Sequence, residues 1–438
     1  MQALPGFRDF LPDQCAARNY IFARWREVAR RYGFVEWDGP PLEPTELYRK
    51  KSGDEIVNQL FNFIDKGERE VALRPELTPT LARVVAAHER EFRKPLKWFS
   101  IGQFFRYEKQ QRGRLREHFQ LNCDIVGESS VAADAELVAL VIDLLRGFAL
   151  TEQDFVVRLS SRDVWLAFLA NKIEAFNEPE LRRFFEVVDK IDRQEDTKTA
   201  ELLQPFGTSI NEIQDWVKST RDFLLNPKTD RSQFEGTTLG KIHELLHDHL
   251  FPRHIGPYLD VDFTVVRGLA YYTGIVFEVF DRKKKLRAIA GGGRYDNLIG
   301  QLSGGAVSMP ALGFAMGDVV IRDLINQVPM AHLQMHNETQ KDLWIQIYAV
   351  IAKEECRSDA LAQIQQLRDA GYRVDYPLRP EKVGKQFQLA ENLGATFAVV
   401  FGDEWPQIKI KRMRTGQQEL VPHDRLLAHL QALSSLSS

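Results

Sequence analysis

Two long apolar runs separated by a short basic stretch constrain the fold of this chain more than any other feature. Residues 97–108 read KWFSIGQFFRYE and residues 118–127 read HFQLNCDIVG, and the stretch between them is rich in arginine. Apolar runs of this length on either side of a polar segment are typical of two antiparallel strands. The sequence therefore predicts a long β-hairpin whose loop carries positive charge.

The basic loop of this hairpin is a candidate phosphate-binding element. It contains Lys109, Arg112, Arg114 and Arg116, and Arg106 precedes it. A guanidinium group makes two parallel charge-assisted hydrogen bonds to a phosphate. A solvated charged turn would explain the same run. Arg106 favours the ligand-binding interpretation, because it falls within the apolar run, where an unpaired charge is costly to bury.

The rest of the chain alternates predicted strands and helices, with one interruption. Apolar side chains recur at helical spacing over residues 13–32, and a further helix is expected over 132–148. Between 164 and 254 the pattern is helical and charged, which predicts an inserted subdomain. After a polar stretch at 327–341, the order βαβαβ predicts a small α/β domain. The predicted domains are residues 1–326, with the helical insertion at 164–254, and residues 341–438.

Composition limits the kind of site that the chain can carry. Hydrophobic residues make up 44% and charged residues 27%, with a formal net charge of -3, so any site for a polyanion must be local. The three cysteines form no CxxC pair, which indicates neither a disulfide framework nor a cysteine zinc site. No stretch approaches the ~20 apolar residues of a membrane span, and we expect a cytoplasmic protein.

Two further segments are candidates to line a pocket. RGLAYY at 267–272 precedes an apolar run, and GGGRY follows at 291–295. Glycines let the backbone approach a ligand closely, and tyrosines supply aromatic walls with polar tips. A tight hairpin turn would account for the glycine run equally well. Neither GxGxxG nor GxxxxGK[ST] occurs, so the common dinucleotide and P-loop motifs are absent from the sequence.

The sequence HELLH at 243–247 matches the HExxH pattern of zinc hydrolases. His249 and His254 lie close enough to supply a third ligand. However, the leucines and Ile242 around the match form an ordinary apolar helix face, and the match falls in the helical insertion, away from the other candidate sites. We therefore expect no metal bound by histidine or cysteine side chains.

Several short motifs, taken in order, resemble those of the histidyl-tRNA synthetases, which are class II aminoacyl-tRNA synthetases. Each motif alone is modest evidence, whereas the ordered set is specific and spans nearly the whole chain. The matching segments are GFRD at 6–9, the first class motif around 32–40, LRPELT at 73–78, the second class motif at 105–120, RGLAYY at 267–272, AGGGRYD at 290–296 and an anticodon-binding region around 382–403.

The resemblance implies an α+β catalytic domain with an antiparallel sheet, a helical insertion and a C-terminal α/β anticodon-binding domain. It also implies that L-histidine is activated with ATP and Mg²⁺ to histidyl-adenylate and then transferred to the 3′ end of tRNA(His), in a homodimer. Both reactants of the first step are anions. Cations that stabilise the charge developing between them are therefore expected to supply much of the catalysis.

The resemblance assigns roles to individual residues. Arg106 and Arg267 would be catalytic, holding the α-phosphate and the histidine carboxylate. Glu108 would contact adenine, and Arg114 the distal phosphates. The remaining ATP-binding positions are His118, Phe119 and Arg294. The other histidine-binding positions are Glu76, Leu77, Thr78, Gln120, Asp124, Tyr271 and Tyr272.

One departure from the family pattern concerns the third class motif. In the family, GFAMG is normally followed by a short sequence that ends in an arginine, which contacts the γ-phosphate. Here Val320 stands at the position of that arginine. Either the contact is missing or another side chain supplies it, and Arg322 and Arg294 are the candidates that the sequence offers.

A regulatory subunit of ATP phosphoribosyltransferase is the alternative from another functional class, because it shares the catalytic fold. Such subunits generally lack the anticodon-binding domain and lose the ATP-binding arginines. This chain retains a C-terminal α/β unit together with Arg106, Arg114 and Arg267. In that unit the basic run at 409–414 is expected either to meet tRNA phosphates or to form a solvated edge strand.

Overall fold

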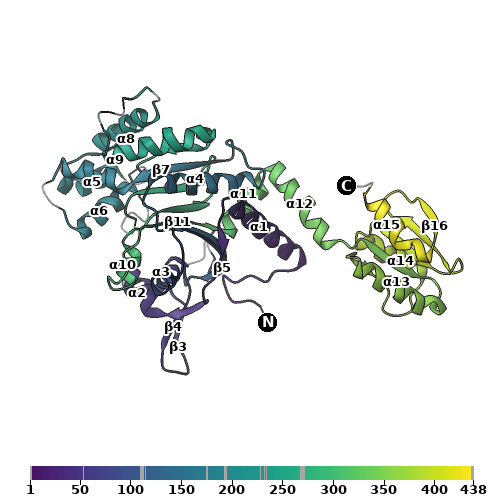
Figure 1. The fold of residues 1–438 in the computed structure, drawn as a ribbon. Coiled ribbons are helices and arrows are strands. Elements are labelled where there is room, and N and C mark those ends of the chain that lie inside the picture. The colour runs from purple at the N-terminus through teal and green to yellow at the C-terminus, as the bar shows by residue number, and fades with distance from the viewer. Residues whose placement is uncertain are drawn as a thin grey trace. The chain divides into compact units, whose positions relative to one another are not determined.

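The computed structural model describes residues 2–52, 54–108, 113, 115–173, 176–191, 195–226, 228–230, 232, 234–266 and 272–435. By its contacts the chain divides into two compact units. The first contains Met1–Leu11 and Ala17–His336, and the second contains Pro12–Ala16 and Asn337–Ser438. Figure 1 shows the helices and strands of both units.

The first unit is built on an eight-stranded sheet in the order β1-β5-β6-β11-β10-β9-β7-β8. The predicted hairpin forms two of its long strands, since β5 (Leu96–Phe105) pairs with β6 (Glu117–Val126) along its whole length. Only the outer pairs β1–β5 and β7–β8 are parallel. The expected α+β fold on a mainly antiparallel sheet is confirmed. The other strands are β1 (Val35–Glu36), β7 (Phe155–Ser161), β8 (Leu259–Val261), β9 (Ile275–Asp281), β10 (Ala290–Arg294) and β11 (Ala311–Gly317).

Helices on the sheet bury its apolar side chains in two clusters. The larger cluster joins the sheet to α1 (Pro12–Arg31), α4 (Val131–Arg146) and α11 (Asp318–Gln327), which lie together in Figure 1. The side chain of Trp25 on α1 is completely buried there. Burial of apolar side chains on this scale is the main stabilising contribution to such a layer. The smaller cluster holds the helices α3 (Thr78–Ala87) and α10 (Leu298–Leu302).

A small three-stranded sheet precedes α3 in the chain, in the order β2-β4-β3. Its last strand leads directly into the segment Arg74–Leu77 and then into α3, so that segment is held between a strand and a helix. The elements of this region are β2 (Leu42–Pro44), α2 (Thr45–Ser52), η1 (Asp54–Gln59), β3 (Asn62–Ile64) and β4 (Glu70–Leu73).

The segment predicted as a helical insertion consists of helices and turns in its described part. Asn177 and Glu180 form a capping box at the start of one helix, and Ser209 caps another, which fixes where these helices begin. The helices are α5 (Arg162–Ala170), α6 (Glu178–Val188), α7 (Asp196–Leu203), η2 (Gln204–Phe206), α8 (Ile210–Leu225), α9 (Thr238–Glu244), the π-helix η4 (Leu245–Leu250), η5 (Phe251–Arg253) and η6 (Gly256–Tyr258).

The second unit contains a five-stranded mixed sheet in the order β13-β12-β14-β15-β16. Lys409, Lys411 and Arg412 of the basic run lie in β15, which pairs with β14 on one side and β16 on the other. Of the two interpretations of this run, the edge strand is therefore wrong. The elements are β12 (Ile347–Ile351), η7 (Glu354–Cys356), α13 (Arg357–Asp369), β13 (Val374–Asp375), α14 (Val383–Asn392), β14 (Phe397–Phe401), β15 (Gln407–Arg412), β16 (Gln418–Pro422), η8 (His423–Arg425) and α15 (Leu426–Ser435).

The structure also rules out one alternative for the glycine run and assigns a structure to the polar stretch. The glycine run at 291–293 lies inside β10, not in a turn. A Cβ on Gly292 would lie 2.3 Å from the carbonyl oxygen of Gly313, so glycine is needed for the two strands to approach. The polar stretch at 327–341 is mostly the helix α12 (Pro329–Leu343), which begins with a proline as helices often do.

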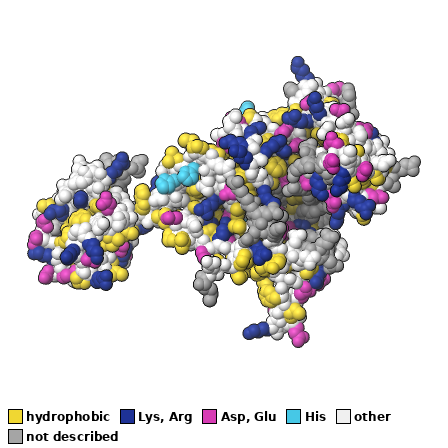
Figure 2. All heavy atoms as spheres, turned by 180° about the vertical axis from the view of Figure 1, so that it is seen from behind, with side chains coloured by type: hydrophobic (Ala, Val, Ile, Leu, Met, Phe, Trp, Pro, Cys, Tyr) yellow, Lys and Arg dark blue, Asp and Glu magenta, His cyan; other side chains and the backbone are white. Residues whose placement is uncertain are grey.

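The surface carries charges of both signs. Figure 2 shows lysine and arginine side chains interspersed with acidic ones over one face of the molecule, in keeping with the small net charge. Within the described ranges, no helix is long and apolar enough to cross a membrane.

Candidate active site

Two cavities share a wall on the large sheet of the first unit. The smaller has a volume of about 460 Å³ and the larger about 620 Å³. Arg106 and Gln120 line both of them. Arg106 follows directly after β5, and its Nε donates a hydrogen bond of 2.9 Å to the carbonyl oxygen of Pro75. Ligands in the two cavities would therefore meet beside a fixed guanidinium group.

The floor of the smaller cavity comes from one strand. Gln120, Asn122 and Asp124 alternate along β6, so their side chains lie on the same face of the sheet. All three are nearly completely buried. Gln120 Nε2 donates to Asn122 Oδ1 over 2.9 Å, which links their positions. The remaining polar side chains that line this cavity are Lys51, Glu76, Thr78, Tyr272 and Tyr295.

Asp124 has an unusual environment for a carboxyl group. Burial raises its pKa to about 7, although the hydrogen bond from Tyr295 and the charge of Lys51 oppose the rise. Tyr295 Oη donates to Asp124 Oδ1 over 2.5 Å. A Cβ on Gly313 would lie 2.0 Å from the same oxygen, so only glycine at that position leaves room for the carboxyl group. The carboxyl group therefore has a fixed place at the base of the cavity.

Polar side chains from other elements complete the wall. Lys51 of α2 forms an ion pair of 2.5 Å with Glu76, which lies just before α3. Tyr272 is partly buried, and loss of solvent around its hydroxyl raises its pKa above the usual range. Donors and acceptors thus face one another across a cavity of amino-acid size.

The larger cavity is bounded partly by the hairpin and partly by loops. Arg106, Glu108 and His118 come from the hairpin, and Gly113 comes from its loop. Burial and the nearby charge of Arg106 lower the pKa of His118 to about 3, so its imidazole is neutral at physiological pH. Four further side chains of its wall come from other elements: Asp189 of the insertion, Glu278 of β9, Arg287 of the β9–β10 loop and Val320 of α11.

Of the predicted residues that the structure describes, all but three line one or both of these cavities. Leu77 is buried at the start of α3 and does not line either cavity. Phe119 points to the other face of β6, where its ring packs 5.2 Å from that of Phe22. Arg294 is the third exception.

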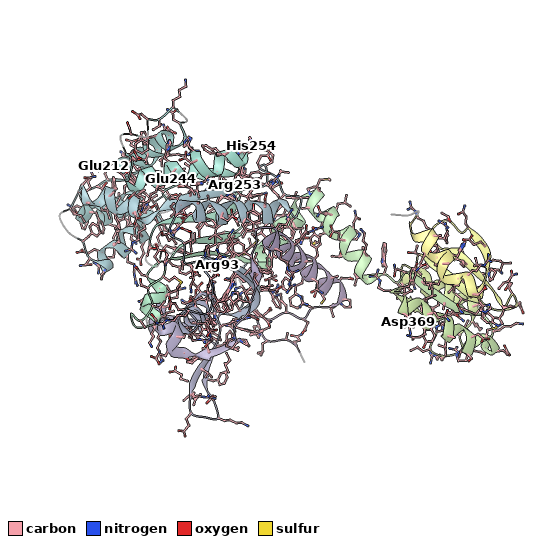
Figure 3. All side chains as sticks on the ribbon, viewed as in Figure 1. Arg93, Glu212, Glu244, Arg253, His254 and Asp369 are labelled. Atoms are coloured by element: carbon pink, nitrogen blue, oxygen red, sulfur yellow. The ribbon has the colours of Figure 1, made fainter. Side chains whose placement is uncertain are left out.

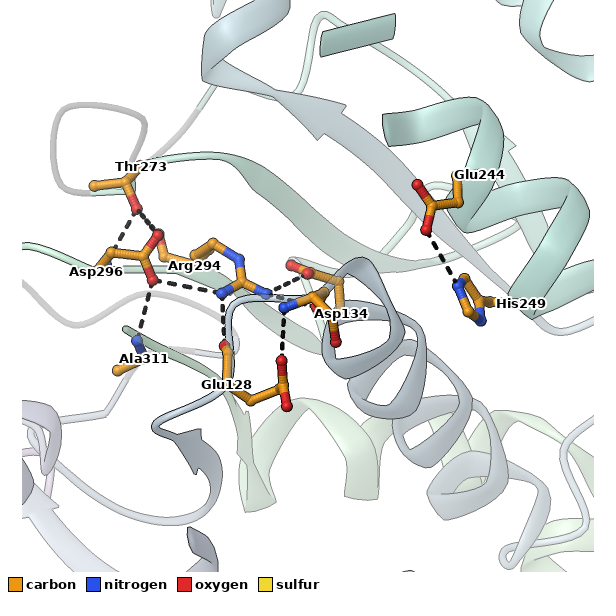
Figure 4. Close-up of polar contacts among 9 residues, drawn as sticks. Glu128, Asp134, Glu244, His249, Thr273, Arg294, Asp296 and Ala311 are labelled. Carbon is orange, nitrogen blue, oxygen red and sulfur yellow. Dashed lines mark hydrogen bonds and ion pairs between the residues drawn. The ribbon is translucent and has the colours of Figure 1, made fainter. Parts of the chain in front are cut away.

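Arg294 is bound within a different cluster, which Figure 4 shows. Its guanidinium group pairs with Asp134 at 2.5 Å and donates to the carbonyl oxygens of Glu128 and Ser130. Its side chain is 10% exposed. These contacts occupy both terminal nitrogens of the guanidinium group, so the structure gives Arg294 a structural place away from the larger cavity.

Three predicted residues lie outside the described part of the chain: Arg114, Arg267 and Tyr271. Their roles stay predictions. Conversely, Lys51, Asn122 and Arg287 line the cavities although no motif pointed to them. Strand alternation between Gln120 and Asp124 was a usable signal for Asn122, whereas Lys51 and Arg287 reach the site only through tertiary contacts.

The HExxH match has a geometry that does not suit a metal site. The His243 and His247 rings stack with centroids 4.0 Å apart and planes 18° apart. Lone pairs of imidazole lie in the ring plane, so parallel stacked rings do not aim at one ion. Glu244, labelled in Figures 3 and 4, pairs with His249 at 3.6 Å. Among the described residues no group of three histidine, cysteine or acidic side chains is placed to hold a metal.

The fold and the site together define a class of enzyme. A mainly antiparallel sheet with two cavities that meet at a hairpin arginine, a helical insertion and a C-terminal α/β unit form the architecture of a class II aminoacyl-tRNA synthetase. The chain belongs to the histidyl-tRNA synthetase family. The family model described as histidyl-tRNA synthetase matches residues 6–318, and the model of an anticodon binding domain matches residues 346–433.

Individual relatives agree with this assignment. A histidine--tRNA ligase of Opitutus terrae is 42% identical over 442 residues, covering 98% of this chain and 97% of that protein. The crystal structure of histidyl-tRNA synthetase from Nostoc matches with a TM-score of 0.77 at 23% identity, covering 99% of both chains. A Bacillus halodurans structure titled ATP phosphoribosyltransferase regulatory subunit/histidyl-tRNA synthetase matches with a TM-score of 0.70 at 20% identity, covering 92% of this chain and 99% of that one. The fold alone therefore does not separate synthetase from regulator.

Proposed function

We propose that this chain activates L-histidine with ATP and transfers it to tRNA(His). The observation that carries the proposal is the shared wall at Arg106, with a buried carboxyl group, Asp124, at the base of the smaller cavity. The smaller cavity would hold histidine and the larger ATP. The reacting carboxylate and α-phosphate would then meet beside one guanidinium group, where positioning and charge stabilisation act together.

Recognition of the imidazole would rest on Asp124 and the polar side chains around it. An imidazole presents one donor and one acceptor in its neutral form. A side chain of similar size without these groups would leave the buried Asp124 and its neighbours unpaired, which is how a polar site rejects analogues. Glu76, Thr78 and Gln120 line the same cavity and complete the proposed histidine-binding set with Tyr272.

The larger cavity suits ATP as its magnesium complex. The neutral His118 offers a flat ring for the adenine, and Glu108 lies on the same hairpin. Mg²⁺ is usually held by one or two carboxylates together with substrate phosphates. Asp189 and Glu278 are carboxylates on the wall of this cavity and are our candidates to hold it. Arg106, assisted by Arg267 as the family resemblance implies, would stabilise the charge that develops at the α-phosphate.

We extend the proposal to the partners on the strength of family membership. The C-terminal unit, which the anticodon-binding model matches, would read tRNA(His). Lys409, Lys411 and Arg412 on β15 supply positive charge for tRNA phosphates, and Lys409 already pairs with Glu404. A cytoplasmic homodimer is the proposed state of the enzyme.

The direct test is aminoacylation of a tRNA(His) transcript with labelled histidine by the purified chain. We expect histidine to be attached at the 3′ end and a non-cognate tRNA to remain uncharged. A protein that binds histidine but charges no tRNA would instead be the regulator, and the proposal would be wrong.

A further inference from the structure

The loss of the third-motif arginine leaves a charge problem in the larger cavity, and the inference that follows rests on the proposed function. Val320, at the position of that arginine, is buried and lines the cavity with an apolar side chain. ATP brings three phosphates, and Arg106 at the shared wall serves the α-phosphate. Arg114, to which the family resemblance assigns the distal phosphates, lies outside the described residues, and the contact to the γ-phosphate that Val320 cannot make needs a cation of its own.

Neither candidate from the sequence meets this need. Arg294 is held by Asp134 and by backbone carbonyls in a separate cluster (Figure 4). Arg322 lies on α11 but does not line the larger cavity. Among the described residues that line it, Arg106 and Arg287 are the only lysine or arginine side chains.

Arg287 reaches the place that the missing arginine would serve. A Cβ built on Gly113 would lie 3.6 Å from Arg287 Cδ and 3.7 Å from Val320 Cγ2. The aliphatic stem of Arg287 and the side chain of Val320 therefore flank the same point of the hairpin loop, although they are 33 positions apart in the chain. Arg287 is exposed to the cavity, so a ligand can reach its guanidinium group.

The loop that carries Arg287 is anchored to the sheet. The Asp281 carboxylate at the end of β9 accepts hydrogen bonds of 2.9 Å from the backbone nitrogens of Lys285 and Leu286. On the other side, the backbone nitrogen of Ile289 donates to the carbonyl oxygen of Val279. Both ends of the short loop are thus fixed, which limits the entropy lost when its arginine binds a ligand.

We propose that Arg287 binds the distal phosphates of ATP. From the β9–β10 loop it makes the contact that Val320 on α11 cannot make. A guanidinium group forms paired, charge-assisted hydrogen bonds to phosphate oxygens, and this geometry does not depend on which element carries it. The assignment gives this chain an arginine that binds the distal phosphates of ATP from outside the three class motifs.

The test compares the binding of ATP and AMP, because AMP lacks the distal phosphates. We measure both by isothermal titration calorimetry with the full chain in the presence of Mg²⁺. Arg287→Ala is expected to weaken ATP binding roughly ten- to a hundredfold, as for the loss of a hydrogen bond between charged groups. AMP binding should stay the same, which also shows that the variant is folded. Lys283→Ala, which removes a positive charge from the same loop outside the cavity, is the matched control and should change neither.

Two further variants sharpen the result. Arg287→Lys should retain part of the ATP affinity, since it keeps the charge but loses the paired geometry. Val320→Arg in the Arg287→Ala background should restore ATP affinity, because it returns a guanidinium group to the same place. An unchanged ratio of ATP to AMP affinity in Arg287→Ala would overturn the proposal. No recovery in the double variant, with AMP binding intact, would overturn the claim that the two positions serve the same phosphate.

Failure of the proposed function is distinguishable from failure of this inference. If the wild-type chain binds ATP more tightly than AMP through Arg287 but charges no tRNA, the Arg287 assignment is supported and the proposed synthetase function is wrong. A chain that charges tRNA(His), and whose ratio of ATP to AMP affinity is the same in wild type and Arg287→Ala, would support the synthetase and contradict the Arg287 assignment.

Discussion

The two cavities of the first unit are built in different ways, although they share Arg106 and Gln120. The smaller cavity, proposed for histidine and called the histidine cavity, has a floor of buried side chains from one strand and a glycine of the next, which fix Asp124 in place. The larger cavity, proposed for ATP and called the ATP cavity, depends on the hairpin loop, the β9–β10 loop and the helical insertion for its outer wall. If the proposals hold, recognition of the amino acid is set by the sheet, whereas the nucleotide site accepts a change in the element that supplies a cation.

The largest effect is expected where the two cavities meet. Arg106→Ala should lower the rate of histidine-dependent exchange between pyrophosphate and ATP by about 10²–10³-fold, in line with loss of one group that stabilises a transition state. Arg146→Ala, at an exposed position of α4 that lines neither cavity, should leave the rate unchanged. Exchange near the wild-type rate in Arg106→Ala would mean that the cavities do not work as one site.

A smaller and selective effect is expected in the histidine cavity. Asp124→Asn should raise the KM for histidine by roughly 10- to 100-fold, because a hydrogen bond to a charged group is lost. The KM for ATP should stay within about twofold. Asp215→Asn, on the exposed face of α8, serves as the control. Equal changes in both KM values would show that the two cavities are not independent in recognition.

The pH dependence of stability should reveal the buried Asp124. Its pKa is raised to about 7 in the folded state, so the folded chain binds more protons than the unfolded chain between about pH 4 and pH 7. Its contribution to stability is therefore lost as pH rises through that window. Relative to Asp124→Asn, the free energy of unfolding of the wild type should fall by roughly 3 kcal/mol between pH 5 and pH 8. Thermal unfolding of both proteins across this range measures the difference, and parallel curves would contradict it.

His118 in the ATP cavity should show the opposite slope. Its folded-state pKa is lowered to about 3, so the unfolded chain binds the extra proton and stability falls as pH decreases below about 6.5. His118→Phe removes this titration. Its free energy of unfolding, relative to that of the wild type, should therefore rise by roughly 2 kcal/mol as the pH falls from 7 to 5. Because the neutral ring acts as a flat surface, the KM for ATP should change by less than about threefold. A large loss of ATP affinity would show that His118 acts through a hydrogen bond instead.

Local patterns in the sequence predict the parts of the fold that they themselves determine. The hairpin β5–β6, the helix α1 and the helical character of the insertion follow from apolar spacing. Of the two interpretations of the glycine run, the turn is wrong, because the glycines allow the close approach of β11, which no local pattern shows. The other interpretation agrees with the structure, since Gly291 lines the smaller cavity. The helix α12 was missed because its polar composition resembles that of a linker.

The same distinction holds for the site. Gln120 and Asp124 are found from a motif on one strand, and Glu76 and Thr78 from another. Arg287 and Lys51 come from loops and helices whose positions depend on the folded chain. Arg294 illustrates the converse, since a residue within a recognised motif serves a structural cluster. Motifs in the sequence therefore predict the site residues on or next to strands better than those on loops and helices.

The most direct test of the whole account is the exchange of labelled pyrophosphate into ATP, measured with each of the twenty amino acids in turn. Two cavities that meet at Arg106, one of them proposed to bind an imidazole, predict exchange with histidine and background exchange with the other nineteen. Exchange with another amino acid, or none with histidine, would contradict the account.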